Sequence, residues 1–288
     1  MESCDILIIG AGAAGISAAA AAYNAGCHHV CMVDANPALG GVLRQCHHAG
    51  FGEGYTGPEY IACLQKDLPM QVDTRLQTTV LSIEKTRIVH LCAPTKGRYS
   101  MAFRQLVFAA GCYEIPLGAL LIAGTRPKGI YTAGQMQARM NLSHQRPDGP
   151  VVILGSGDLG LLMATQIAAL QIPVTLIEQR SECGGLARNQ GCLNSPYVQL
   201  YCQTTIEKIC GERALQGVVL SNGSFLPCHT LLTAVGLRPE HTLIAPLASP
   251  SWLHLAGNCH RVQSMIGRVV DDGYQAGMDA YRQWRNEL

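Results

Sequence analysis

The sequence has few charged and few aromatic residues. Only 14% of its 288 residues are charged and 6% are aromatic, and 21 basic residues against 20 acidic ones leave a formal net charge of +1. Such an even balance provides no electrostatic basis for binding nucleic acid or an anionic membrane surface. The apolar fraction of 48%, in contrast, supports a sizeable core and excludes intrinsic disorder. The length is typical of about two domains.

Cysteines at redox or metal-ligand spacing are also absent. The 13 cysteines form no Cys-x-x-Cys, and the close pair Cys27 and Cys31 fits neither a zinc ribbon nor an iron–sulfur run. The count is odd, whereas small secreted disulfide scaffolds are short and carry an even number. We therefore expect no metal site, and we expect most thiols to be small core residues in a reducing cytosol, which predicts a cytoplasmic protein.

Residues 6–22 carry no charge and so resemble a signal peptide or a short membrane span. The residues before this run, Glu2 and Asp5, are acidic rather than basic, and the run is short for a span. It also contains a Gly-x-Gly-x-x-Gly motif, which suggests a different origin for its composition. We therefore expect neither a targeting segment nor a membrane span.

The motif lies between a predicted strand and a predicted helix. Residues 4–9 favour a strand, Gly10-Ala-Gly12-Ala-Ala-Gly15 follows at once, and an alanine-rich helical stretch runs to about residue 24. The next strand ends at Asp34, 19 residues after Gly15. Gly10 allows a tight turn, Gly12 allows a pyrophosphate to approach the backbone, and Gly15 allows close helix packing. The helix N-terminus offers N–H groups to phosphates and Asp34 can accept hydrogen bonds from a ribose, so this is a dinucleotide fingerprint in its required context.

The same unit occurs a second time. A strand over residues 151–154 precedes Gly155-Ser156-Gly157-Asp158-Leu159-Gly160, a helix follows to about residue 170, and the next strand ends at Glu178. One Gly-x-Gly-x-x-Gly is weak evidence, but two copies in the same context are strong. We expect Asp158 to support the dipole of the helix that follows. Glu178 disfavours a 2′-phosphate by charge repulsion and so indicates NADH, whereas Arg180 keeps NADPH as the less favoured alternative.

Each fingerprint is followed by a predicted β-meander and by a strand that ends near a glycine, Gly111 in the first half and Gly236 in the second. The first meander is expected over residues 78–109 and the second over 215–234, where Asn222-Gly223 is a strong hairpin signal. The last 50 residues or so are too few for an independent domain. We predict an α/β protein with two Rossmann-like dinucleotide-binding domains, the second inserted in the first: residues 1–114 with 241–288, and residues 115–240.

This order resembles the pyridine nucleotide–disulfide oxidoreductase superfamily. The resemblance implies FAD at the first fingerprint and NAD(P)H at the second. In those flavoproteins a strand ending in Ala-Thr-Gly closes the first FAD segment, and a Gly-Asp near the C-terminus touches the ribityl chain. The matching positions here are Ala109-Ala110-Gly111 and Gly257-Asn258, each different at one residue. An Asn amide can still hydrogen-bond a ribityl hydroxyl or a phosphate.

Further segments are similar to a narrower subgroup, the FAD/NAD(P)-binding oxidoreductases that accompany glycerol-3-phosphate-dehydrogenase-type flavoproteins. They include Gly40-Gly41-Val-Leu-Arg-Gln-Cys46 and Gly124-Thr-Arg-Pro127. Hydrogen cyanide synthase and opine oxidase subunits are more distant relatives of this subgroup. The fingerprints and the resemblance together imply FAD contacts at Gly10, Gly12, Ala13, Ala14, Gly15, Asp34, Ala35, Gly41, Val80, Ala110, Gly111, Gly257 and Asn258, and NAD(P) contacts at Gly155, Ser156, Gly157, Asp158, Leu159, Gly160, Glu178 and Gly236.

The redox dithiol of the disulfide reductases is missing. Gly40-Gly41 is followed by Cys46 alone, where those enzymes carry Cys-x-x-x-x-Cys, so a dithiol–disulfide mechanism lacks its chemistry. We expect an FAD-dependent oxidoreductase that transfers hydride between NAD(P)H and FAD. The resemblance implies that it is the NAD-facing subunit of a complex, whose flavoprotein or iron–sulfur partner oxidises a small metabolite. Two alternatives stay open: a stand-alone NADH-dependent enzyme that uses Cys46, and a non-catalytic FAD-binding assembly subunit.

Overall fold

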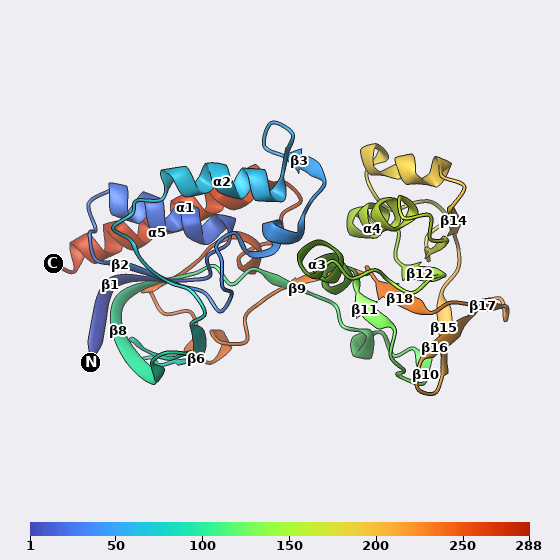
Figure 1. Ribbon diagram of the computed structural model, residues 1–288. Helices are drawn as coiled ribbons and strands as arrows, with labels where there is room; N and C mark the ends of the chain where they lie inside the picture. Colours follow the sequence, from blue (N-terminus) through green and yellow to red (C-terminus); the bar gives the residue numbers. More distant parts are fainter. The chain divides into compact units, whose positions relative to one another are not determined.

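The computed structural model describes residues 1–288 and divides them into two compact units. Unit 1 comprises Met1–Tyr113 and Arg238–Leu288, and unit 2 comprises Glu114–Leu237. The expected boundaries after residues 114 and 240 compare with residues 113 and 237 in the structure. Each unit contains a sheet with five parallel strands, and the predicted class of two Rossmann-like α/β domains is confirmed (Figure 1). Where the chain passes between the units, β9 (Cys112–Glu114) and β19 (Leu237–Pro239) form a two-stranded sheet.

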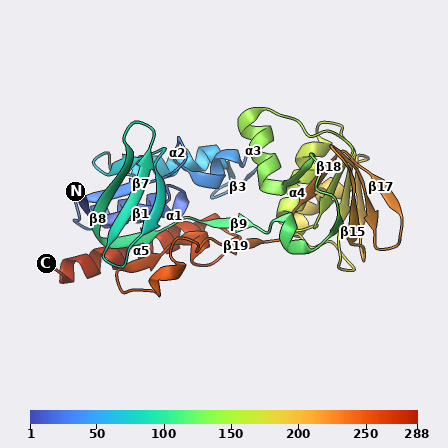
Figure 2. The ribbon, with the colours of Figure 1, turned by 90° about the horizontal axis from the view of Figure 1, so that it is seen from below.

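Unit 1 is built on a seven-stranded sheet. Its parallel strands run in the order β5-β2-β1-β8-β20. The antiparallel strand β7 pairs with β8 (Figure 2), and β6 pairs with β7. Alternate residues of β1 face opposite sides, so Ile6 and Ile8 pack toward the helices while Leu7 and Ile9 pack into the core on the other face. The strands of unit 1 are β1 (Glu2–Ile9), β2 (Val30–Val33), β3 (Ala49–Phe51), β4 (Tyr55–Thr56), β5 (Asp73–Arg75), β6 (Thr79–Ile83), β7 (Ile88–Ala93), β8 (Gly97–Phe108) and β20 (Leu253–Leu255).

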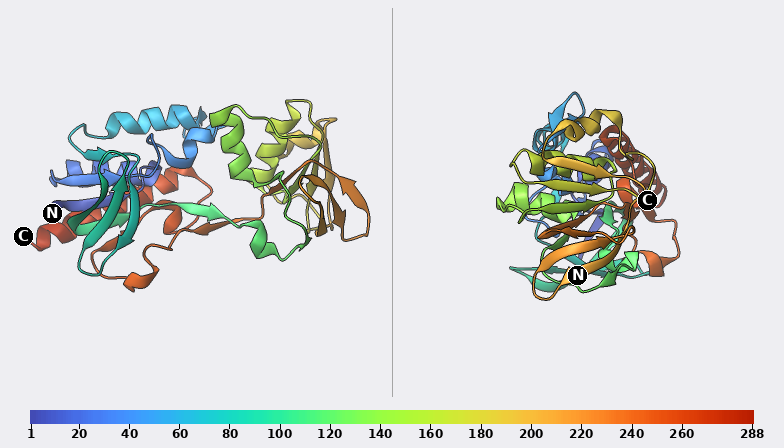
Figure 3. Two further views of the ribbon diagram at one scale, coloured as in Figure 1. Left: turned by 60° about the horizontal axis from the view of Figure 1, so that its bottom comes forward. Right: turned by 90° about the vertical axis from the view of Figure 1, so that its right-hand side faces the viewer.

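Three helices gather on one side of this sheet: α1 (Ala13–Asn24), α2 (Gly57–Asp67) and α5 (Ile266–Asn286) (Figures 1 and 3). Glycines allow α5 to lie directly against α1. A Cβ added at Gly273 would be 2.3 Å from the carbonyl oxygen of Ala14, and one added at Gly277 would be 2.3 Å from that of Ala18. The C-terminal segment therefore completes unit 1 by backbone contact between two helices.

Unit 2 consists of three layers. The parallel sheet has the order β11-β18-β12-β13-β14, with α3 (Ala133–Ser143) and α4 (Asp158–Ala168) packed on one face. A four-stranded sheet, β10-β15-β16-β17, shares a core with the other face. The strands of unit 2 are β10 (Ala123–Gly124), β11 (Ile130–Thr132), β12 (Val151–Leu154), β13 (Val174–Ile177), β14 (Val198–Tyr201), β15 (Ile206–Gly211), β16 (Leu215–Leu220), β17 (Phe225–Pro227) and β18 (Thr230–Thr233).

The two parallel sheets have the same arrangement. Strands β20-β8-β1-β2-β5 of unit 1 correspond in order to β11-β18-β12-β13-β14 of unit 2, so a glycine turn follows the central strand and an acidic residue follows its neighbour in both units. The repeat thus includes the edge strands β5 and β14, which the sequence does not predict. Short 3₁₀ helices complete the connections: η1 (Gly41–Gln45), η2 (Leu117–Leu120), η3 (Ala187–Asn194), η4 (Ala245–Leu247) and η5 (Gly257–Cys259).

Candidate nucleotide-binding sites

The first glycine turn joins β1 to α1 at the carboxyl edge of the parallel sheet of unit 1. Gly10 has a φ of +105°, and a Cβ there would lie 2.3 Å from the carbonyl oxygen of Ala109, at the end of β8. Only glycine satisfies both conditions. A Cβ added at Gly15 would lie 1.8 Å from the carbonyl oxygen of Gly10, so α1 begins in direct contact with the turn.

The second glycine turn, between β12 and α4, has the same construction. Gly155 has a φ of +106°, and a Cβ there would lie 2.4 Å from the carbonyl oxygen of Ala234. A Cβ added at Gly160 would lie 2.2 Å from the carbonyl oxygen of Gly155. The two fingerprints are therefore alike in backbone conformation and in packing as well as in sequence.

Both turns have open space where a dinucleotide pyrophosphate would approach. Gly12 and Gly157 are the N-cap residues of α1 and α4, and a Cβ added at either meets no atom within 4 Å. No side chain caps either helix. The first N–H groups of both helices are thus available to phosphate oxygens, and the helix dipole favours negative charge there. The residues present fit a dinucleotide in each unit.

Asp34, the first residue after β2, turns its carboxylate toward the first turn. Its Oδ2 accepts a hydrogen bond from the backbone N–H of Ala11 (2.7 Å), and its Oδ1 accepts from the backbone N–H and Nδ2 of Asn36 (2.7 and 2.9 Å). An ionised carboxylate has about four acceptor positions. Because Asp34 is only half-buried, the position left on Oδ2 can accept a ribose hydroxyl.

Glu178 has the corresponding position after β13, but its surroundings differ. Only 6% of the residue is exposed. Its Oε2 accepts from the N–H and Oγ–H of Ser156 (3.0 and 2.5 Å), and its Oε1 accepts from the backbone N–H and Nε of Arg180 (3.0 and 3.1 Å). Burial by itself raises the pKa of the carboxyl, but the hydrogen bonds from Arg180 and Ser156 outweigh it and lower the pKa to about 2. Glu178 is therefore ionised and fully engaged by protein donors at neutral pH.

The segment after Glu178 is bonded to the second turn. The Oγ of Ser156 accepts from the backbone N–H of Gly184 (2.8 Å), and Oδ1 of Asp158 accepts from the N–H of Leu186 and Nδ2 of Asn189 (2.8 and 2.7 Å). Asp158 is the first residue of α4, where its charge complements the helix dipole as expected from the sequence. It also holds this segment in place, a role that the spacing of the motif does not reveal.

Several other predicted FAD residues surround the first turn. Ala13 and Ala14 are buried in the first turn of α1, and a Cβ added at Gly41 would lie 3.2 Å from the Cα of Gly12. Ala35 is exposed beside Asp34, whereas Val80 is half-buried against the core beneath the sheet.

Further predicted residues follow the ends of strands. Ala110 and Gly111 come directly after β8, and Gly111 has a φ of +78°. In unit 2, Leu159 packs with the core on the helix side, and Gly236 follows β18 with a φ of +129°. These positions border the turns of their own units, and their cofactor contacts stay predictions.

The turn at Gly257 depends on a residue that the sequence does not single out. The N–H of Gly257 donates to Oδ2 of Asp272 on α5 (2.7 Å), whose Oδ1 also lies 3.0 Å from Nδ1 of His260. The Oδ1 of Asn258 accepts from the N–H of Gln263 (2.9 Å), which directs the amide nitrogen to act as the donor toward a ligand. Nothing in the spacing of Asp272 marks it, because its partner is 15 residues away.

Cys46 is buried, with 9% of the residue exposed, and its Sγ donates to the carbonyl oxygen of Val42 (3.4 Å). Burial raises the pKa of this thiol to about 11. Because the thiolate is the reactive form, the thiol is poorly suited to nucleophilic or redox chemistry at neutral pH. None of the 13 cysteines is joined to another in a disulfide bond.

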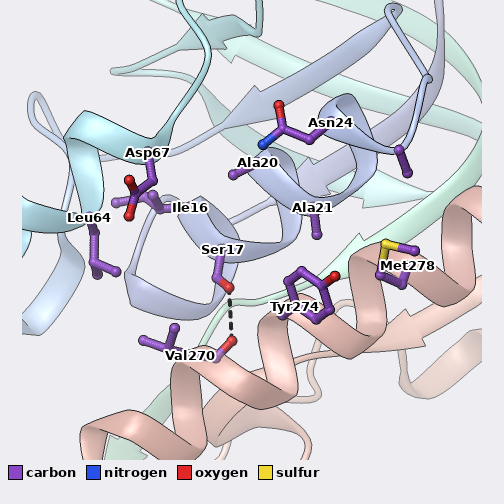
Figure 4. A pocket seen from close by; sticks show the side chains of 11 residues that line it. Ile16, Ser17, Ala20, Ala21, Asn24, Leu64, Asp67, Val270, Tyr274 and Met278 are labelled. Carbon is purple, nitrogen blue, oxygen red and sulfur yellow. Dashed lines mark hydrogen bonds between the residues drawn. The ribbon is translucent and has the colours of Figure 1, made fainter.

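A separate groove of about 430 Å³ lies on the outer side of the helices of unit 1 (Figure 4). Ala20 and Ala21 of α1, Leu64 of α2, and Tyr274 and Met278 of α5 contribute to its lining. The Oγ of Ser17 donates to the carbonyl oxygen of Val270 (2.8 Å) and joins α1 to α5 beside it. The groove contains no residue of the glycine turns, so it is not a cofactor site of the kind that the fingerprints predict.

Two other features are absent from the structure. No group of three or more His, Cys, Asp or Glu side chains is arranged to hold a metal ion. No helix has both the length and the apolar character that crossing a bilayer requires.

Two glycine turns of the same construction, on parallel sheets of the same strand order, define a protein with two dinucleotide-binding domains. The chain belongs to the pyridine nucleotide-disulphide oxidoreductase family, whose sequence model matches residues 4–251. The family resemblance seen in the sequence is thereby confirmed. Membership of this family identifies the chain as a flavoprotein of the oxidoreductase class.

Relatives of this chain include components of larger enzymes. The chain is 28% identical over 205 residues to the hydrogen cyanide synthase subunit HcnB of Pseudomonas protegens, which covers 69% of this chain and 43% of the relative. It is 31% identical over 215 residues to an opine oxidase subunit of Agrobacterium tumefaciens, covering 67% of this chain and 41% of the relative. The chain thus spans less than half the length of these relatives.

Among solved structures, the thioredoxin reductase of Lactococcus lactis superposes with a TM-score of 0.79 over 99% of this chain and 100% of that one. The sequence identity is 18%, so the likeness is one of fold alone.

Proposed function

We propose that this chain binds FAD in unit 1 and a nicotinamide nucleotide in unit 2, transfers hydride between them, and exchanges electrons with a separate subunit. The matched pair of glycine turns carries the proposal, because each has the backbone conformation, open space and uncapped helix that a dinucleotide needs. A single such turn would support one nucleotide; two support a nucleotide-to-flavin reaction in the family to which the chain belongs.

The bound cofactors supply the hydride chemistry, and the protein supplies their position and electrostatics. In unit 1, the N–H groups at the start of α1 bind the pyrophosphate and Asp34 accepts a ribose hydroxyl. Asn258 donates through its amide nitrogen to an oxygen of the ribityl chain or the phosphate, since its amide oxygen is used by Gln263. In unit 2, the N–H groups at the start of α4 bind the second pyrophosphate.

The chemistry of the cysteines supports a separate electron partner. The sequence has no redox dithiol, and burial raises the pKa of Cys46, the remaining candidate, to about 11. Reduced flavin without a dithiol needs another acceptor or donor. HcnB and the opine oxidase relative are both named as subunits, which supports a partner subunit for this chain. The resemblance noted in the sequence implies that this partner is of the flavoprotein or iron–sulfur type.

The two turns can be tested separately with Gly12→Val and Gly157→Val. Neither position has a positive φ, and a Cβ at either meets no atom, so both variants are expected to fold. We expect Gly12→Val to lose FAD, measured as flavin absorbance per protein after reconstitution, because its side chain fills the pyrophosphate space. We expect Gly157→Val to keep FAD and to lose binding of nicotinamide nucleotide. Retention of FAD by a folded Gly12→Val variant would contradict the assignment of unit 1.

A further inference from the structure

We propose that the groove between α1, α2 and α5 of unit 1 binds a small amphiphilic cation, an amine with an apolar chain. The apolar lining takes the chain, and the carboxylate of Asp67 takes the charged nitrogen. The groove contains no residue of either glycine turn, so the inference goes beyond the proposed function and does not rest on it.

The groove exists because one face of α1 is built from small residues. The part of the lining that α1 and its C-cap contribute includes Ser17, Ala20, Ala21, Asn24 and Ala25, at the spacing of a single helix face. This face follows the helix for about 12 Å. The floor is therefore long and shallow, and it suits an extended chain.

The neighbouring helices supply larger side chains as walls. Figure 4 shows Leu64 of α2 on one side of α1, and Tyr274 and Met278 of α5 on the other. The hydroxyl of Ser17 already donates to the carbonyl oxygen of Val270 (2.8 Å), so it places no demand on a ligand. The volume of about 430 Å³ is in the range of small-molecule sites.

The charge of the groove is negative. Asp67 is the one charged residue of the lining, and none of the ion pairs in the structure includes it. It is the last residue of α2, and Asn24, the last residue of α1, is also in the lining. The carboxyl ends of helices carry partial negative charge, and the last turn of α1 has no basic residue to offset it. The groove therefore favours a cation over a neutral or anionic ligand.

The surface around the groove favours a small molecule over a second protein. The exposed residues beside the lining include Gln65 and Lys66 on α2, and Asp271, Gln275 and Asp279 on α5. A stable protein interface covers about 800 Å² per partner and has an apolar centre. Here the apolar surface is confined to the groove, which matches a ligand with one short chain.

The test titrates the purified protein with octylamine, 1-octanol and octanoate, which share a chain and differ in charge, and measures binding by calorimetry. We expect octylamine to bind roughly fivefold to tenfold more tightly than 1-octanol, and octanoate to bind most weakly. Asp67→Asn should lower the affinity for octylamine to that for 1-octanol. Asp271→Asn removes an exposed acid of α5 outside the lining and should leave the preference in place.

A second variant tests the location. Ala20 is half-buried on the face of α1 that lines the groove, so Ala20→Leu is expected to fold and to fill the space. We expect it to lose at least tenfold in affinity for octylamine while keeping the circular dichroism spectrum and the FAD binding of the wild type.

Other results would overturn the inference and leave the proposed function standing. They are failure to bind octylamine, equal affinity for the three probes, a preference that survives Asp67→Asn, and an equal loss in Asp271→Asn. Undiminished binding of octylamine by folded Ala20→Leu would place the ligand elsewhere. A wild-type dimer that Ala20→Leu dissociates would show that a second copy of the chain covers the groove, and would also overturn the inference.

Discussion

Glu178 is a buried carboxylate whose charge is stabilised by hydrogen bonds from Ser156 and Arg180. These bonds lower its pKa from an ordinary value of 4.5 to about 2, against the opposing effect of burial. The folded state therefore binds this proton less readily than the unfolded state. The stability that Glu178 contributes is present above pH 4.5 and is lost as the pH falls from there toward 2.

This linkage predicts the acid sensitivity of the protein. Between pH 5 and pH 3 we expect the free energy of unfolding of the wild type to fall by about 2 kcal/mol more than that of Glu178→Gln. The measurement is urea unfolding at the two pH values, followed by circular dichroism. Glu182→Gln, an exposed acid nearby, serves as the control and should behave like the wild type. Parallel curves for wild type and Glu178→Gln would show that the carboxylate does not carry this linkage.

At the residue scale, the sequence predicts positions better than it predicts roles. The glycines of both turns have the conformations and contacts that the fingerprint requires, because backbone sterics at these positions permit little else. Asp34 and Glu178 are placed correctly after their strands, but their exposure depends on neighbours such as Gly184 that the motif does not include. Asp272 could not be found at all, since its contact with Gly257 depends on how α5 returns to the sheet.

At the element scale, the crossing of α1 and α5 determines how unit 1 closes. Two glycines one helical turn apart, Gly273 and Gly277, allow the backbones to touch at Ala14 and Ala18. Ala14 lies in the first turn of α1, where the FAD pyrophosphate is proposed to bind. Packing of the C-terminal helix is thus coupled to the geometry of the first nucleotide site.

Enlarging this contact should destabilise the unit. Gly277→Val places a Cβ 2.3 Å from the carbonyl oxygen of Ala18, so we expect a loss of about 1–3 kcal/mol in the free energy of unfolding. Gly267→Ala, in the same helix, meets no atom within 4 Å and should stabilise by up to about 1 kcal/mol through helix propensity. Chemical denaturation measures both. Equal effects of the two substitutions would contradict a close crossing at Gly277.

Buried strands were the elements most readily predicted. The strands expected just before Asp34 and Glu178 are β2 and β13, because short apolar runs between turn signals are strong indicators. The alanine-rich helix expected after the first glycine motif begins at Ala13, inside that motif, since the glycine turn leads directly into it. The sequence does not predict α2 or α3, which bury few residues and are less apolar overall than α1 and α4. Nor did it predict β5 and β14, which depend on pairing with β2 and β13.

At the scale of the whole molecule, the two units have the same strand order and the same kind of glycine turn. They differ in the acidic residue that follows the second strand: Asp34 in unit 1 has an acceptor position left for a ligand, whereas the acceptor positions of Glu178 in unit 2 are taken by protein donors. The family of the chain and its two turns support FAD and a nicotinamide nucleotide as its cofactors. Burial raises the pKa of Cys46 to about 11, which favours its thiol form and supports the proposed hydride transfer, a reaction that needs no thiolate.

The most direct test is an anaerobic titration of FAD-loaded protein with NADPH and NADH, observed through the visible absorbance of the flavin. We expect the flavin band to bleach in the wild type and equally in Cys46→Ser, and to persist in Gly157→Val, which retains FAD. A bound flavin that both nucleotides leave oxidised would contradict hydride transfer to FAD as the central activity. Loss of bleaching in a folded Cys46→Ser variant would instead show that the reaction depends on the thiol.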